Sequence, residues 1–290
     1  GCKGDKKKGA KTEEPSGITT GTAGITGTAV SYPLTVTDSL GKEIVIESEP
    51  LNISSVSLGS DEILLSLVDR SRIRSVSPIA EDPGLSNISD RIGGIDILGT
   101  NSEMMIAAQP DIVIGTDFTN PDFISQIEDA GIPVYTFATP GSIEDVKKVI
   151  AELAYILNAA ENGRELIDWM DVKLNNIKSK VDTLKPDEVM KALSLDSFYY
   201  TYGTGTTFDS IAEYAGVTNL AADNGMEMWV QLSKEQVVSL NPGMILLPSW
   251  SYEGFDAVKF AEEFKNDQSL AGVDAVRNDK VFTLPEAHMT

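Results

Sequence analysis

The sequence predicts an α/β protein of two Rossmann-like lobes, each with a central parallel sheet, joined by one long α-helix. Strand patterns alternate with helical patterns from Tyr32 onward, which is typical of doubly wound parallel sheets. A unit of helix, proline break and strand occurs twice, as NSEMMIAAQPDIVIG (101–115) and SKEQVVSLNPGMILL (233–247). Between the two copies, residues 142–184 carry a helical pattern almost throughout.

The first 31 residues are expected to form a flexible tether ahead of the folded body. They begin Gly1-Cys2, continue with a lysine-rich patch and then run through a Gly/Thr/Ala/Ser tract. This composition has too few apolar side chains to bury a core. Such a tether would let the folded body move roughly 30 Å from its start.

The N-terminal lobe is predicted to span residues 32–159. Apolar residues alternate on either side of Ser39-Leu40-Gly41, which indicates a hairpin. The next strand leads into an amphipathic helix for which Ser60 or Asp61 is the expected N-cap. In order, the predicted elements are a hairpin (32–47), a strand with its helix (52–68), a strand (73–78), the first copy of the repeated unit, a helix (123–131) and a strand (132–138).

A linking helix is predicted over residues 160–185. The longer helical stretch is expected to be interrupted at Asn162-Gly163, and Pro186 ends it. The part from Ala160 to Thr183 would be about 36 Å long at about 1.5 Å per residue. A helix of this length would hold two lobes at a nearly fixed separation.

The C-terminal lobe is predicted to span residues 186–290 and to repeat the alternation of the first. GTGTT (203–207) lacks the lysine of a phosphate-binding loop, so a strand-to-helix turn is the better interpretation. The final helix that would close this lobe is expected to be absent. In order, the predicted elements are a strand (189–196), a loop (198–207), a helix (208–216), the second copy of the repeated unit, a helix (255–265) and a strand (280–285).

Charge and composition argue against several functional classes. The net charge of −21 disfavours nucleic acid as a partner, because phosphate binding needs clustered Lys and Arg. One Cys and one His allow neither an internal disulfide nor a Cys/His zinc site. The sequence contains no run of about 18 or more apolar residues, so no membrane span is predicted. No general base is expected near a nucleophile, so we predict a protein that is not an enzyme and carries no cofactor.

Each copy of the repeated unit places a glutamate early in its helix. With Asn101 and Ser233 as N-caps, Glu103 and Glu235 both fall at the second helical position. A carboxylate there interacts favourably with the helix dipole, by about 0.3–1 kcal/mol. That structural role would explain one glutamate. Its recurrence in two related lobes favours a further role at equivalent places on one side of the molecule.

Four stretches carry a family resemblance: NISSVSLGSDEIL (52–64), EMMIAAQPDIVI (103–114), GTGTTFDSIAEYAGVTNLA (203–221) and WVQLSKEQVVSLNP (229–242). With the two lobes and the linking helix, they resemble the substrate-binding proteins of ABC importers, in the subgroup that delivers iron-siderophores, haem and cobalamin. The resemblance covers about residues 32 to 290. It implies a receptor outside the cytoplasm that binds a small-molecule metal chelate and delivers it to an ABC permease dimer. It also implies that Glu103 and Glu235 dock into arginine pockets on the two permease subunits.

The start of the chain is similar to that of a bacterial lipoprotein. In such a protein Cys2 would carry the lipid and anchor a monomer to the cell membrane. The apolar signal segment that normally precedes this cysteine is not in the sequence. An incidental surface thiol is the alternative.

A ligand is expected between the lobes, beyond the carboxyl ends of the strands. Aromatic residues are frequent in the loops at these ends and suit a large, flat, partly apolar ligand. Trp229 is added because it matches a ligand-contacting tryptophan of the cobalamin-binding relatives. The expected ligand-binding residues are Ser57, Leu58, Gly59, Thr116, Phe118, Tyr199, Tyr200, Trp229, Trp250 and Tyr252.

The shortage of basic residues in these loops favours a corrinoid, with a ferric siderophore second and haem third. A polyanionic catecholate complex would need Arg or Lys partners, for which Arg74 and Arg91 are the nearest candidates. Haem stays open, because one of these tyrosines or His288 could be an axial ligand. A single histidine argues against bare zinc or manganese. Two other classes remain as alternatives: an αβ enzyme acting on a cofactor or sugar-like molecule, and a surface adhesion module.

Overall fold

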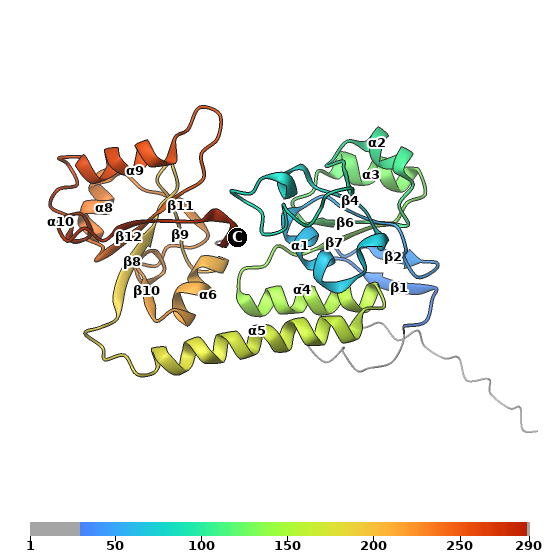
Figure 1. The fold of residues 1–290 in the computed structure, drawn as a ribbon, viewed down its shortest axis with the longest axis horizontal. Coiled ribbons are helices and arrows are strands. Elements are labelled where there is room, and N and C mark those ends of the chain that lie inside the picture. Colours follow the sequence, from blue (N-terminus) through green and yellow to red (C-terminus); the bar gives the residue numbers. More distant parts are fainter. Residues whose placement is uncertain (1–29, 289–290) are drawn as a thin grey trace, which may run out of the picture.

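The computed structural model describes residues 30–288, so Cys2 and nearly all of the predicted tether lie outside the described residues. Two α/β lobes stand side by side along one long helix (Figure 1), which confirms the predicted fold class. Within residues 30–288, no helix is both long and apolar enough to cross a membrane.

The N-terminal lobe is built on a five-stranded parallel sheet of order β5-β4-β3-β6-β7. The antiparallel hairpin predicted around Gly41 is present, and Gly41 has the positive φ (79°) that the turn requires. The strands of this lobe are β1 (Leu34–Thr37), β2 (Glu43–Ile46), β3 (Ile53–Ser55), β4 (Ile73–Val76), β5 (Asp96–Ile97), β6 (Ile112–Thr116) and β7 (Val134–Phe137).

Helices cover both faces of this sheet. On one face Met105 and Phe123, from two different helices, pack on Val113 of the sheet. On the other face Leu64 and Leu153 pack in the larger core. The helices are α1 (Leu58–Leu67), α2 (Ser102–Ala108), α3 (Pro121–Asp129) and α4 (Ile143–Ile156), with the short turns η1 (Arg70–Arg72) and η2 (Pro78–Glu81).

The C-terminal lobe has a four-stranded parallel sheet of order β10-β8-β12-β13 and a separate antiparallel ribbon of β9 and β11. Its strands are β8 (Met190–Ser194), β9 (Tyr200–Tyr202), β10 (Val217–Asn219), β11 (Trp229–Gln231), β12 (Met244–Pro248) and β13 (Val281–Leu284). Its helices are α6 (Thr207–Tyr214), α7 (Leu220–Asp223), α8 (Lys234–Leu240), α9 (Ala257–Asn266) and α10 (Asp274–Arg277), and the last described element is η3 (Glu286–His288). The absence of a final helix stays a prediction.

The linking helix α5 (Ala160–Val181) runs beneath both lobes (Figure 1). The break that separates it from α4 lies at Asn158, which has a φ of 54°, so the interruption predicted at Asn162-Gly163 was wrong. Gly163 serves packing instead. A Cβ at this position would come within 2.5 Å of the Ala154 Cβ, so the glycine lets α5 lie close against α4.

The predicted N-cap of α1 was also wrong, because the helix begins earlier. Ser57 is the cap, and its hydroxyl accepts from the Ser60 amide. Asp61 is fully buried, and its carboxylate accepts from the Ser77 amide (3.1 Å) and the Ser77 hydroxyl. This tertiary contact, which local pattern does not reveal, explains why the residue is acidic.

The predicted loop 198–207 contains a strand. In it β9 pairs with β11 in an antiparallel ribbon, with Tyr202 opposite Trp229. The turn that follows is the predicted strand-to-helix turn. Its Thr206 caps α6 by accepting from the Asp209 amide.

Candidate functional site

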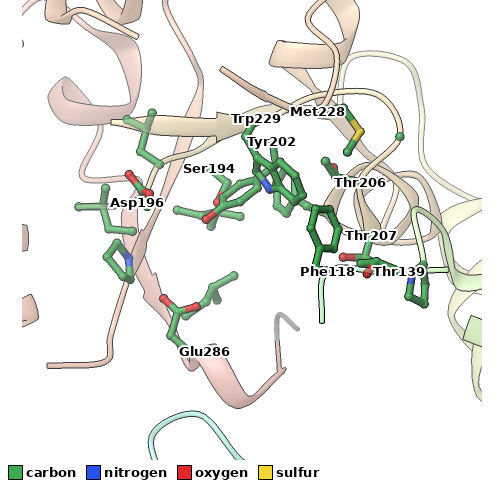
Figure 2. Close-up of a pocket in the computed structure, with 18 of the residues that line it drawn as sticks. Phe118, Thr139, Ser194, Asp196, Tyr202, Thr206, Thr207, Met228, Trp229 and Glu286 are labelled. Carbon is green, nitrogen blue, oxygen red and sulfur yellow. The ribbon is translucent and has the colours of Figure 1, made fainter. Parts of the chain in front are cut away.

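A cavity of about 340 Å³ lies between the two lobes. The N-terminal lobe contributes residues that follow β6 and β7, and the C-terminal lobe contributes most of the rest. Figure 2 shows the labelled side chains converging on this space. The lining residues are Asp117, Phe118, Thr139, Pro140, Ser194, Leu195, Asp196, Tyr202, Gly205, Thr206, Thr207, Phe208, Met228, Trp229, Leu246, Leu247, Pro248, Leu284 and Glu286.

The β9–β11 ribbon supplies the aromatic wall of the cavity. Trp229 and Tyr202 are direct partners in the ribbon, so their side chains lie on the same face. The Tyr202 ring also packs on Phe208 at a centroid distance of 6.0 Å. Trp229 is 50% exposed, which leaves much of the indole available to a ligand. Two flat rings held on one rigid ribbon make a preformed apolar surface.

Phe118 faces this wall from the other lobe (Figure 2). It follows the carboxyl end of β6, and its amide donates to the Thr116 hydroxyl at 3.3 Å. The neighbouring Asp117 carboxylate accepts from both the amide (3.0 Å) and the hydroxyl (2.7 Å) of Thr139. The loop is therefore held in place while the Phe118 ring, 69% exposed, projects freely. A flat ligand could lie between Phe118 and Trp229.

Carboxylates give the cavity its charge. Asp196 and Glu286 line it from the C-terminal lobe and Asp117 from the N-terminal lobe. Burial, and then the negative charge of Asp196, raise the pKa of Glu286. Burial raises the pKa of Tyr202 to about 12, with Asp196 and Glu286 adding to the effect. Tyr202 therefore carries its proton at neutral pH.

Among the described side chains, which do not include that of His288, no lysine or arginine lines the cavity. The two arginines considered from the sequence are engaged elsewhere. Arg74 pairs with Asp96 at 2.8 Å, and Arg91 donates to the Leu65 carbonyl at 3.1 Å. No positive side chain thus balances the carboxylates.

Of the ten ligand-binding residues expected from the sequence, Phe118 and Trp229 line this cavity. Ser57, Leu58 and Gly59 instead form the cap and first turn of α1, with the Ser57 hydroxyl 2.6 Å from that of Ser60. The Thr116 hydroxyl accepts from the Phe118 amide, but Thr116 is not part of the cavity lining. The ligand contacts of all ten stay predictions.

The other four predicted aromatics lie outside the cavity lining. Tyr199 packs against Phe260 and Phe264 of α9. Tyr200 lies on β9 next to the wall but is not part of the lining. Trp250 stacks on Tyr252 with a centroid distance of 4.8 Å. These rings mainly pack against one another and against the C-terminal lobe.

Trp250 also joins the two lobes. Its indole N–H donates to an Asp82 carboxylate oxygen at 2.9 Å, and the other oxygen accepts from the Gly84 amide at 2.8 Å. A Cβ on Gly84 would come within 2.4 Å of the indole Cδ1, so the edge of the indole that carries the N–H lies close against this loop. A second bridge runs from the Asn87 amide group to the Ala287 carbonyl. The described conformation is therefore held together across the cleft.

Sequence reasoning missed several lining residues, among them Asp196, Tyr202, Thr206, Met228 and Glu286. Tyr202 could have been found from FYYTYG if that stretch had been interpreted as a strand, because alternate residues share a face. Glu286 carried no local signal. It reaches the cavity because η3 follows β13, whose carboxyl end lies at the cleft.

The two glutamates of the repeated unit occupy matching positions. Glu103 lies in the first turn of α2, capped by Asn101, and Glu235 in the first turn of α8, capped by Ser233. Each helix ends in a left-handed residue immediately before its proline, with φ values of 49° and 44°. Both glutamates are exposed. A hydrogen bond from its own amide, then one from Ser233, lower the pKa of Glu235.

No group of three or more His, Cys, Asp or Glu side chains within residues 30–288 could hold a metal ion. A metal held directly by the described side chains alone is therefore not supported. Cys2 lies outside the described residues, so its lipidation stays a prediction.

A family model described as periplasmic binding protein matches residues 53–288. A Bacillus subtilis protein named an uncharacterized ABC transporter substrate-binding lipoprotein, YvrC, is 27% identical over 257 residues, covering 87% of this chain and 78% of its own. A cobalamin-binding protein of Halobacterium salinarum is 26% identical over 223 residues, covering 75% of this chain and 59% of its own.

The molybdate-binding protein MolA of Haemophilus influenzae is 24% identical over 272 residues, covering 87% of this chain and 75% of its own. Its solved structure, bound to molybdate, matches this fold with a TM-score of 0.71. The structural match covers 87% of this chain and 83% of that one at 22% identity. Relatives with the same fold therefore differ in the ligands that their names give.

Proposed function

This chain belongs to the periplasmic binding protein family, and on that premise we propose that it captures a metal chelate between its lobes and delivers it to an ABC permease. Its general role is that of a substrate-binding protein of an ABC transporter, working outside the cytoplasm. The observation that carries the proposal is the cavity itself, which both lobes line and whose aromatic wall faces Phe118.

We favour a corrinoid as the ligand. Phe118 and Trp229 offer flat apolar surfaces on opposite sides of the cavity, which suits a macrocycle. The volume of about 340 Å³ is near the lower end of the range of about 300–1,000 Å³ for ligand pockets. A corrinoid would therefore enter with one edge between the rings, or the lobes would separate to admit it.

Charge sets the order of the other candidates. Molybdate and catecholate complexes are anions that need basic partners, and no basic side chain lines this cavity within the described residues. A ferric hydroxamate siderophore avoids this conflict and ranks second. Haem ranks third: its carboxylates would be repelled by Asp196 and Glu286, although the Tyr202 phenol, which lines the cavity, could supply an axial ligand.

Delivery would use the exposed glutamates of the repeated unit. Glu103 and Glu235 project from equivalent first turns, one on each lobe, and a permease dimer has two equivalent subunits. Carboxylate–guanidinium pairs would orient the complex without making it permanent. A lipid on Cys2 would keep this monomeric receptor at the membrane, next to its permease.

Calorimetric titration of the purified protein tests the proposal. Cyanocobalamin, ferrichrome, haem and molybdate are added in turn, and saturable binding of one metal chelate at micromolar concentration or below is expected. Trp229→Ala should weaken that binding at least about tenfold, because it removes the largest ring of the wall. Trp169→Phe, on the exposed face of α5, is the control. Absence of saturable binding to every chelate would contradict the proposal.

A further inference from the structure

We propose that Asp196 and Glu286 make the C-terminal wall of the cavity select its ligand by charge, so that a cationic chelate binds more tightly than a neutral one of the same shape. This inference rests on the proposed function and specifies the class of ligand that the same cavity takes. It depends on three features: a carboxylate without a partner, a second that is only partly engaged, and the absence of a counter-charge in the lining.

Glu286 is the carboxylate without a partner. It lies in η3, directly after β13, and its side chain points toward the cavity (Figure 2). Among the side chains that the structure describes, which leave out that of His288, none donates a hydrogen bond to this carboxylate and no cation pairs with it. The side chain is only partly exposed, so water solvates its charge incompletely. A ligand that brings a hydrogen-bond donor or a positive charge would supply the partner that the Glu286 carboxylate lacks.

Asp196 is engaged through one oxygen. Its Oδ1 accepts from the amides of Phe198 (2.7 Å) and Tyr200 (2.8 Å), which fixes the turn between β8 and β9. No hydrogen bond is formed by Oδ2 within the described residues. The turn therefore positions the aspartate rigidly and leaves its second oxygen for the cavity. Its negative charge adds to that of Glu286, because like charges in a shared space reinforce one another's field.

The remaining lining residues do not compensate these charges. The Asp117 carboxylate adds a third negative charge, although it is already engaged with Thr139. The other polar lining residues are serine and threonine hydroxyls and the phenol of Tyr202, all of which are neutral. In a cleft with apolar walls, such a field acts on a ligand more strongly than it would at an open surface.

The selection explains how one aromatic cleft could discriminate among flat chelates. Phe118 and Trp229 would accept any large flat surface, because stacking depends little on the identity of the ring. Charge on the ligand edge that meets Asp196 and Glu286 would then decide between ligands of the same shape. Anionic chelates would be excluded by repulsion from the carboxylates rather than by shape.

The test compares two pairs of probes that differ in charge. Aquocobalamin is cationic and cyanocobalamin neutral, and they differ in one axial ligand. Ferrioxamine B is cationic and ferrichrome neutral, and both are ferric hydroxamates. Dissociation constants are measured by calorimetry at neutral pH for the wild type, Glu286→Gln and Asp196→Asn. Asparagine retains the Oδ1 acceptor that holds the turn. Glu262→Gln, an exposed carboxylate on α9, is the matched control.

In the wild type, the cationic member of the pair that binds is expected to bind about tenfold more tightly, and added salt should reduce this ratio. Each cavity variant should lower the ratio several-fold, whereas Glu262→Gln should leave it unchanged. Binding of both members with equal affinity, or a ratio that neither variant alters, would overturn the inference and leave the proposed function intact. Failure of all four probes to bind would overturn this inference, and if haem also failed to bind, the proposed function would be overturned with it.

Discussion

Replacing Trp250 by phenylalanine should shift the ligand-free protein from closed toward open arrangements of its lobes. The indole N–H donates to the Asp82 carboxylate of the opposite lobe. Phenylalanine retains a ring that can stack on Tyr252 but has no donor. The substitution therefore removes one bond between the lobes and leaves the packing within the C-terminal lobe largely in place.

The expected magnitude follows from the partial exposure of both partners. Hydrogen bonds to charged groups contribute about 1.5–3 kcal/mol, and we take about 1 kcal/mol here because Trp250 and Asp82 are only half-buried. That free energy corresponds to about a fivefold change in the ratio of closed to open molecules. Asp82→Asn replaces one of the two accepting oxygens by an NH2 group that would face either the indole N–H or the Gly84 amide, so it should also shift the ratio toward open molecules.

Pulsed electron spin resonance can measure this ratio. Spin labels at Gln126→Cys on α3 and Glu262→Cys on α9, in a Cys2→Ser background, place one label on each lobe. Trp250→Phe should increase the long-distance part of the distribution about fivefold relative to the short-distance part, and Trp169→Phe should not. An unchanged distribution in Trp250→Phe would refute the view that this bond holds the lobes together.

Three further predictions concern stability and transport. Gly163→Ala should lower the free energy of unfolding by about 1–2 kcal/mol, measured by urea denaturation, because the added methyl separates α4 from α5; Gly93→Ala, which meets no neighbour within 4 Å, should not. Burial raises the pKa of Asp61 to about 6, above its unfolded value of 3.8, so the folded state binds the extra proton between these values and stability falls as pH rises through this window. Between pH 4 and pH 7, the free energy of unfolding of Asp61→Asn should therefore rise by about 2 kcal/mol relative to that of the wild type, measured by urea denaturation at each pH. A difference between the two proteins that does not change with pH would contradict the raised pKa of Asp61. Glu103→Lys with Glu235→Lys should abolish transport in cells while leaving ligand affinity unchanged, and reduced affinity would show that the glutamates act on the ligand instead.

The succession of strands and helices could be predicted because it depends on local pattern. The hairpin around Gly41, the amphipathic α3 and the proline that opens each repeated strand all leave periodic or turn signals in the sequence. Errors occurred where a residue serves a distant contact. From the sequence, Gly163 suggests a helix break, but in the structure it allows α5 to approach Ala154 closely. Asp61 suggests a helix cap, but its carboxylate instead accepts a hydrogen bond from the Ser77 amide.

The site could be predicted only in part, because it forms between lobes. Strand ends indicated the correct side of each sheet but not which side chains reach across the cleft. Trp250 and Tyr252 follow a strand end as expected, yet their rings stack on each other and the indole bonds to the opposite lobe. Glu286 and Tyr202 line the cavity through the placement of η3 and the pairing of β9 with β11, which no single stretch of sequence specifies.

The repeated unit connects these results, because its two copies place aromatic residues at equivalent positions with different roles. When Glu103 is aligned with Glu235 and Pro110 with Pro242, Phe118 aligns with Trp250. Both rings follow the carboxyl end of a parallel strand and so reach the cleft. Phe118 remains free on the cavity wall, whereas Trp250 is bonded across the cleft to Asp82. The helix of each copy begins with an exposed glutamate, and the strand of each copy ends two residues before its aromatic residue. Equivalent positions of one repeated unit thus place one ring in the cavity lining and the other in a hydrogen bond between the lobes, which explains why the repeat alone predicts where these rings lie but not what they contact.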